Sequence, residues 1–158
     1  MIPGVRKRIA IVVCLAVPLA GLDLYVKSQL LAAPLYLHRR SGEWMVSSAI
    51  LLVVALLLAR LPSRLLAASA GLLAAGVLGN LVSAGMHHGL VANPFVIDHQ
   101  DFELAFNLAD LFVLAGIAMV TVSALRLTVR YRHVLPQSTL TMRLVRHVRS
   151  RLASSDSG

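Results

Sequence analysis

The sequence LAFNLADLFVLAGIAMVTVSAL, residues 104–125, is the stretch that decides the fold of this 158-residue chain. Asp110 is the one charged residue among these 22 residues, which would measure about 33 Å as an α-helix. The hydrocarbon core of a bilayer is about 30 Å thick and needs roughly 17–25 helical residues. We therefore expect a membrane-spanning helix here, with Asp110 about 9 Å inside its outer end.

Three further apolar stretches precede it, at residues 9–26, 44–59 and 65–82, and the second is slightly short for a span. Hydrophobic residues make up 58% of the chain and charged residues 14%, whereas a soluble domain is about half apolar and a quarter charged. The sequence predicts an all-α membrane protein, a four-transmembrane-helix bundle with a short extracytoplasmic loop region. We expect a membrane domain over residues 1–127 and a basic cytoplasmic tail over residues 128–158.

The basic residues predict the orientation of this bundle. Twelve of the fifteen Lys and Arg residues lie before the first span, between the second and third, or after the fourth. The positive-inside rule then places both termini in the cytoplasm. The net charge of +8 follows this topology, and the chain carries no nucleic-acid motif, so we expect no nucleic-acid partner. The first apolar stretch is longer than a signal-peptide core and lacks an A-x-A site, which favours a retained helix.

Ionisable and amide side chains within the apolar stretches are the candidate functional residues, because burying them in a membrane is costly. Asp23 precedes Lys27 by four residues, the favourable order for a helical ion pair that tethers the helix end to its neighbours. Asn80 needs a hydrogen-bond partner near the end of the third span. Asn107 and Asp110 are three residues apart and share one helix face.

Small residues recur every four positions in the third span, at Gly71, Ala75, Gly79 and Ser83. Such a stripe lets two helix backbones approach closely in a membrane. We expect another span to pack against it.

The second outer loop, residues 84–103, supplies a candidate partner for Asp110. Asp98 ends a short apolar, strand-like run in this loop. Two carboxylates that share a proton can act as base toward water and as acid toward a carbonyl oxygen. A plain solvated acidic loop is the alternative. The histidines of the loop lack metal-ligand spacing, and we expect no metal and no organic cofactor.

At these positions the chain resembles the lipoprotein signal peptidase family, signal peptidase II, the aspartic proteases of the bacterial inner membrane. The first span shares with that family an acid four residues before a lysine. The other shared motifs, which look like its GN, VVDF and FNxAD boxes, are Gly79-Asn80-Leu81, Val96-Ile97-Asp98 and Phe106-Asn107-Leu108-Ala109-Asp110, followed by Gly116.

The resemblance implies an endopeptidase that cuts diacylglyceryl-modified prolipoproteins just before the lipidated cysteine, near the outer face of the inner membrane. It implies lipidated prolipoproteins and membrane lipids as partners, no cofactor, and a monomer. Asp98 and Asp110 would be the catalytic pair. Polar support would come from Asn80, Asn107, Asp23 and Lys27.

The chain also departs from the family pattern. Ser83 and Ala84 stand where the family has an Asp-Arg pair, and the first-loop N-x-G-A-A-F box corresponds to residues 40–44, which keep only its glycine. That loop leaves little room for a small sheet. An alternative alignment, four residues on from Gly89, puts Asn93 at the loop aspartate and predicts an inactive pair.

Two other functions remain open. One is a degenerate relative that binds lipoprotein or helical membrane partners without cutting them. The other is a small transporter with Asp110 as proton relay, which lacks a second buried acid at mid-span.

Overall fold

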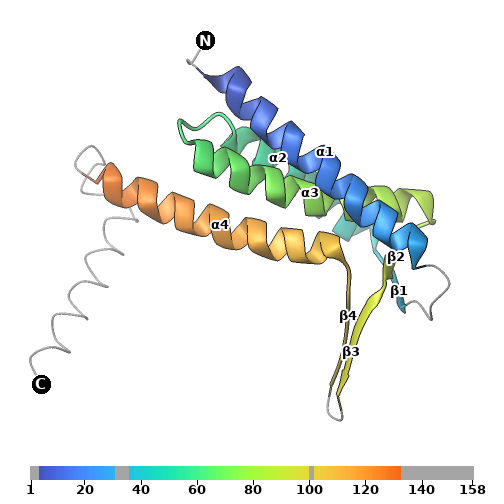
Figure 1. Ribbon diagram of the computed structural model, residues 1–158. Coiled ribbons are helices and arrows are strands. Elements are labelled where there is room, and N and C mark those ends of the chain that lie inside the picture. The colour runs from blue at the N-terminus through green and yellow to red at the C-terminus, as the bar shows by residue number, and fades with distance from the viewer. Residues whose placement is uncertain (1–3, 31–35, 100–101, 133–158) are drawn as a thin grey trace, which may run out of the picture. The chain divides into compact units, whose positions relative to one another are not determined.

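The computed structural model describes residues 4–30, 36–99 and 102–132 (Figure 1). Its elements in chain order are α1 (Val5–Gln29), β1 (Tyr36–Arg39), α2 (Gly42–Leu58), α3 (Arg64–Met86), β2 (Leu90–Asn93), β3 (Phe95–His99), β4 (Phe102–Phe106) and α4 (Leu108–Arg130). Met1–Thr121 forms one compact unit, and a second unit begins at Val122 within α4. Most of the predicted tail, residues 133–158, lies outside the described residues.

Of the four helices in the described residues, three are long and apolar enough to cross a membrane. These are α1, α3 and α4, with 25, 23 and 23 residues. The fourth, α2, is apolar but has 17 residues and measures about 25 Å, which is somewhat less than the hydrocarbon core. The chain is thus a mainly helical membrane protein, and the crossing of the bilayer by α2 stays a prediction.

Helix α3 lies at the centre of the first unit because its small residues admit neighbours on more than one face. A Cβ built on Gly71 would lie 3.0 Å from Leu15 Cβ of α1, and one on Gly79 would lie 2.7 Å from Asp23 Oδ2. The predicted stripe is therefore confirmed as the contact with α1. On another face, Gly76 abuts Ala109 and Val113 of α4.

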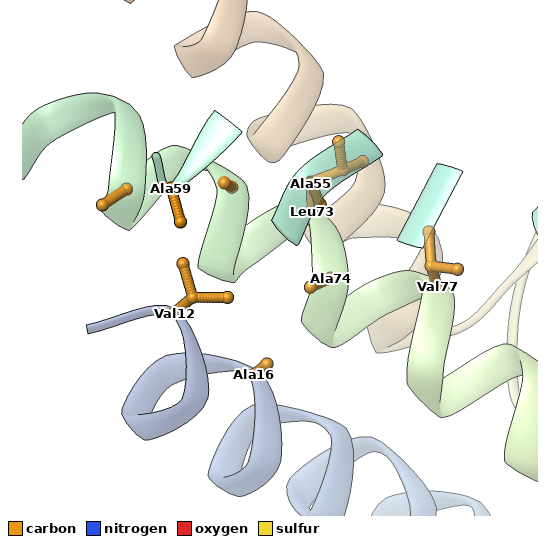
Figure 2. Close-up of a cluster of buried hydrophobic side chains, with 9 residues drawn as sticks. Val12, Ala16, Ala55, Ala59, Leu73, Ala74 and Val77 are labelled. Atoms are coloured by element: carbon orange, nitrogen blue, oxygen red, sulfur yellow. The ribbon is translucent and has the colours of Figure 1, made fainter. Parts of the chain in front are cut away.

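The apolar core between α1, α2 and α3 is built mostly from alanine (Figure 2). Small side chains let the helix backbones approach closely, so packing in the bilayer does not depend on large core residues. Arg8 adds a polar contact at one end of this core, where its Nε donates to the carbonyl of Ala59, the residue that follows α2. The buried core residues are Val12, Ala16, Ala55, Ala59, Ala67, Ala70, Leu73, Ala74 and Val77.

The described parts of the segments between α1 and α2 and between α3 and α4 form two antiparallel two-stranded sheets, so the expectation of an all-α fold was wrong there. β1 pairs with β2, with Tyr36 opposite Asn93, and β3 pairs with β4, with Phe95 opposite Phe106. The first outer loop therefore has room for a strand, contrary to expectation.

The strands also change where α4 begins. The helix starts at Leu108 rather than at residue 104, because residues 102–106 form β4. Asp110 consequently lies in the first turn of α4 and not several residues inside a span.

Candidate functional site

Six polar side chains meet where α1, α3, β2 and the start of α4 converge. We call them the polar cluster: Asp23, Lys27, Asn80, Asn93, Asn107 and Asp110. All but Asp110 are buried, and Asp110 is half-buried. Burial of so many polar groups is favourable only when they are hydrogen-bonded to one another.

The ion pair of α1 forms the inner part of the cluster, as the i,i+4 spacing predicts. Lys27 Nζ donates to Asp23 Oδ2 at 2.6 Å and to Asn80 Oδ1 at 2.9 Å. The other oxygen of Asp23 accepts from the backbone N–H of Ala109 at 2.9 Å. That N–H belongs to the first turn of α4, where helix amides have no partner within the helix. The pair therefore fixes the start of α4 against α1 and α3.

Asn107 and Asp110 form a reciprocal cap at the start of α4. The N–H of Asp110 donates to Asn107 Oδ1 at 3.0 Å, and the N–H of Asn107 donates to Asp110 Oδ2 at 3.2 Å. This is the geometry of a capping box, with an acid three residues after the N-cap. Asn80 Nδ2 donates to the remaining oxygen, Asp110 Oδ1, at 2.9 Å. Asn80 and Asn107 thus both hydrogen-bond to Asp110, and their role as supports of a catalytic residue stays a prediction.

Asn93 completes the cluster from the end of β2. Its Oδ1 accepts from Asn107 Nδ2 at 2.7 Å, and its Nδ2 donates to the carbonyl of Ala105 at 3.2 Å. Its Nδ2 also lies 3.2 Å from Nδ1 of His38 on β1. Asn107 therefore stands between Asn93 and Asp110 and bonds to both. The alternative alignment, which places Asn93 at the loop position, agrees with this geometry.

Asp98, the preferred loop residue, lies elsewhere. It is exposed on β3, opposite Glu103 of β4, and three residues beyond Phe95, or about 10 Å along the strand. The β3–β4 hairpin extends away from the start of α4 (Figure 1), and in its register Asp98 lies three pairs beyond Phe95. Within the described residues the expected contact of Asp98 with Asp110 does not form. The catalytic roles of both residues stay predictions.

A groove of about 620 Å³ opens beside Asp110 and Asn80. Its walls come from α2, α3, α4 and the β3–β4 hairpin, and they are mostly apolar, with Leu51, Val77 and Leu114 among them. Such a groove suits an apolar chain or helix, and Asp110 offers one carboxyl group to whatever enters. The proton exchange of a carboxylate pair needs a second carboxyl, and Asn93 supplies an amide instead.

Two features of the site were not predicted from the sequence. Arg40 and Trp44 line the groove, although they belong to the first-loop segment that departs from the family motif. Ser83 is buried, and its Oγ has no hydrogen-bond partner within the described part of the chain. Among the described residues, no group of three His, Cys, Asp or Glu side chains is arranged to hold a metal ion.

The comparison with protein families identifies the family of this chain. The family described as signal peptidase (SPase) II matches residues 31–126, which is 96 of the 158 residues. The matched range begins just after α1, runs into α4, and includes the groove, β2 and the capping box. No curated protein and no solved structure matches the chain.

Proposed function

The chain belongs to the signal peptidase II family, and we propose that it binds diacylglyceryl-modified prolipoproteins in the membrane without cutting them. Family membership indicates a signal-peptidase-like role in the membrane. The observation that carries the finer proposal is the amide of Asn93. It bonds to Asn107 beside Asp110, where the alternative alignment puts the family's loop aspartate.

The proposal rests on the need for two carboxyl groups in acid–base catalysis of peptide cleavage. A pair of carboxylates cleaves a peptide bond because one removes a proton from water while the other protonates the substrate. The Asn93 amide neither gives up nor takes up a proton in the physiological range. Among the described residues that line the groove, Asp110 alone has a carboxyl group, so in this proposal the site retains hydrogen bonding and lacks the proton exchange.

The groove supports the binding half of the proposal. The lipid anchor and the signal helix of a prolipoprotein are both apolar, and the groove lies between apolar helices of a membrane protein. Burial of their surface against packed side chains, with Asp110 and Asn80 as polar contacts, would hold the precursor. We also propose that the site lies near the outer face of the membrane and that both termini lie in the cytoplasm.

A binding and cleavage assay with the full chain in nanodiscs tests the proposal. A fluorescent diacylated prolipoprotein should bind, and no shortened product should appear on a gel. Ser48→Phe narrows the groove from α2 and should weaken binding about tenfold or more, as expected for losing a well-packed contact. Ser47→Phe, at the exposed neighbouring position, is the matched control and should bind normally. Absence of binding by the wild-type chain would overturn the proposal.

The second candidate function is the peptidase reaction itself, with Asp98 and Asp110 as the pair. The family match favours it, and so does the support that Asn80 and Asn107 give to Asp110. It requires cleavage by the wild-type chain, with a loss of several orders of magnitude in both Asp98→Asn and Asp110→Asn. Cleavage that survives Asp98→Asn would exclude Asp98 from the reaction.

A gain-of-function variant separates the two candidates further. Asn93→Asp places a second carboxyl group beside Asn107, and we expect slow cleavage to appear in this variant. Adding Asp110→Asn should abolish the new activity, because the two groups act as one unit. If the wild-type chain cuts and Asn93→Asp does not improve the rate, Asn93 does not hold the dyad position.

A further inference from the structure

Arg40 is a groove residue to which the proposed function assigns no role. Its side chain lies over the indole ring of Trp44, with Cζ 4.9 Å from the ring centroid, and both residues line the groove. Its backbone N–H donates to the carbonyl of Gly89 at 2.8 Å, which fixes the base of the side chain. Its Nε is buried, and within the described residues it has no hydrogen-bond acceptor.

An arginine with a buried, unpaired Nε would be stabilised by a hydrogen-bond acceptor from another molecule. A guanidinium keeps its charge at all physiological pH values, and a buried donor without a partner destabilises the folded state. Among the described residues that line the groove, Asp110 is the one acidic residue, and Asn80 and Asn107 already donate to its two oxygens. The cation therefore borders an apolar groove with its Nε unpaired.

These features select a ligand with an anionic head and an apolar chain. Guanidinium groups bind phosphate through two parallel hydrogen bonds, and the groove walls beyond Arg40 are apolar, including Leu51, Leu111 and Leu114. A choline headgroup would seek the face of an aromatic ring, and Arg40 already covers the face of Trp44. We propose that this groove binds an anionic phospholipid, with its phosphate on Arg40 and one acyl chain along the walls.

The inference goes beyond the proposed function, because a membrane phospholipid would occupy the groove in the absence of any prolipoprotein. Trp44 makes the test direct, since it is the single tryptophan of the chain and its fluorescence reports on the groove. The probe is acyl-brominated phosphatidylglycerol, which quenches a nearby indole, compared with acyl-brominated phosphatidylcholine. Each is added as the same minor fraction to phosphatidylcholine nanodiscs that hold the full chain.

We expect the brominated phosphatidylglycerol to quench Trp44 about fivefold more effectively than the brominated phosphatidylcholine, the preference that one basic residue gives for anionic lipid. Arg40→Gln should abolish this preference. The neighbouring Arg39→Gln makes the same charge change at an exposed position and should preserve it. Excess glycerol phosphate should not displace the lipid, because a free headgroup lacks the acyl chain.

Three results would overturn the inference: equal quenching by both lipids, equal effects of the two arginine variants, or displacement by glycerol phosphate. Equal effects of the arginine variants would indicate general surface attraction instead of a site. If Arg40→Gln does not fold, Ser48→Phe narrows the groove with Arg40 intact and should reduce quenching by the anionic lipid. The assay contains no prolipoprotein, so its failure would leave precursor binding untouched, and failure of precursor binding would leave this result standing.

Discussion

The polar cluster and the β3–β4 hairpin adjoin each other, and both contain carboxylates. The carboxylates of the cluster are enclosed by hydrogen-bond donors, whereas those of the hairpin are exposed. In the cluster, Asp23 and Asp110 each use both oxygens in hydrogen bonds, and one of the two bonds in each case comes from another helix. In the hairpin, Asp98 and Glu103 face each other across two strands and are exposed. A match to a family motif therefore does not by itself fix the position of an acidic side chain. The side chain is fixed only where several helices or strands donate hydrogen bonds to it.

The hairpin packs against the cluster at the end where β3 begins and β4 ends. Its side chains are less buried toward the turn between the two strands. The rings of Phe95 and Phe106 lie 5.5 Å apart at its first pair, next to Asn107. Beyond that pair, Ile97, Phe102 and Leu104 are all about half exposed. Variants of the cluster should therefore cost far more stability than variants of the hairpin.

The largest effect is expected from breaking the buried ion pair. Lys27→Met leaves the Asp23 carboxylate buried without its cation, and Asn80 loses a donor. We expect a loss of about 3–5 kcal/mol in the free energy of unfolding, since removal of one partner leaves an uncompensated charge. Denaturant unfolding in detergent measures this loss.

Two controls sharpen this prediction. Adding Asp23→Leu to Lys27→Met removes the orphaned charge and should recover part of the stability. Asp98→Asn, on the exposed hairpin, should change stability by no more than about 0.5 kcal/mol. Equal losses in Lys27→Met and Asp98→Asn would end the distinction between the two regions.

A smaller loss is expected where α1 approaches α3. Gly79→Leu forces a side chain toward Asp23 Oδ2, which a Cβ alone would meet at 2.7 Å. Overpacking of this kind costs about 1–3 kcal/mol, seen as a lower melting temperature in detergent. Gly85→Leu is the matched control on the same helix, because a Cβ there meets nothing within 4 Å. Unchanged melting of Gly79→Leu would contradict the observed helix contact.

The smallest effect is expected where Tyr36 of β1 contacts Glu103 of the hairpin. A hydrogen bond to Glu103, together with the charge of that carboxylate, raises the pKa of Tyr36 above its ordinary value of about 10. The contact thus stabilises the fold below pH 10, and the contribution is lost as the pH rises through the folded-state pKa. Tyr36→Phe should lower the melting temperature slightly at pH 8 and not above the folded-state pKa.

Ultraviolet titration checks this pKa directly. The difference in phenolate absorbance between the wild-type chain and Tyr36→Phe isolates one of the three tyrosines. Glu103→Gln removes the charge and should return the pKa of Tyr36 toward 10. A pKa of Tyr36 that does not respond to Glu103→Gln would remove this link between β1 and the hairpin.

Much of the fold follows from local sequence patterns. Hydrophobic length predicts the helices, the four-residue spacing predicts the Asp23–Lys27 pair, and the glycine stripe predicts the approach of α1 to α3. The start of α4 was misplaced because residues 104–106 are apolar and suit a strand as well as a span. Hydrophobicity alone does not distinguish the two.

The choice between Asp98 and Asn93 could not be made from local pattern. Val-Ile-Asp matches the family motif residue by residue and favours Asp98. The position of Asn93 depends on the pairing of β1 with β2, which sets Tyr36 opposite Asn93 across more than fifty residues of sequence. The place of Arg40 and Trp44 in the groove likewise depends on tertiary structure, because the other walls come from α3, α4 and the β3–β4 hairpin.

The reciprocal cap at the start of α4 bears on how such motifs persist in evolution. Asn107 and Asp110 satisfy each other's backbone amides, and loss of an N-cap costs roughly 0.5–2 kcal/mol. Natural selection for a stable helix would thus retain both residues in a lineage that had stopped hydrolysing peptides. Across related sequences, the FNxAD signature would then indicate common ancestry and the same fold. The residue at position 93 would distinguish active enzymes from descendants that no longer cleave peptides.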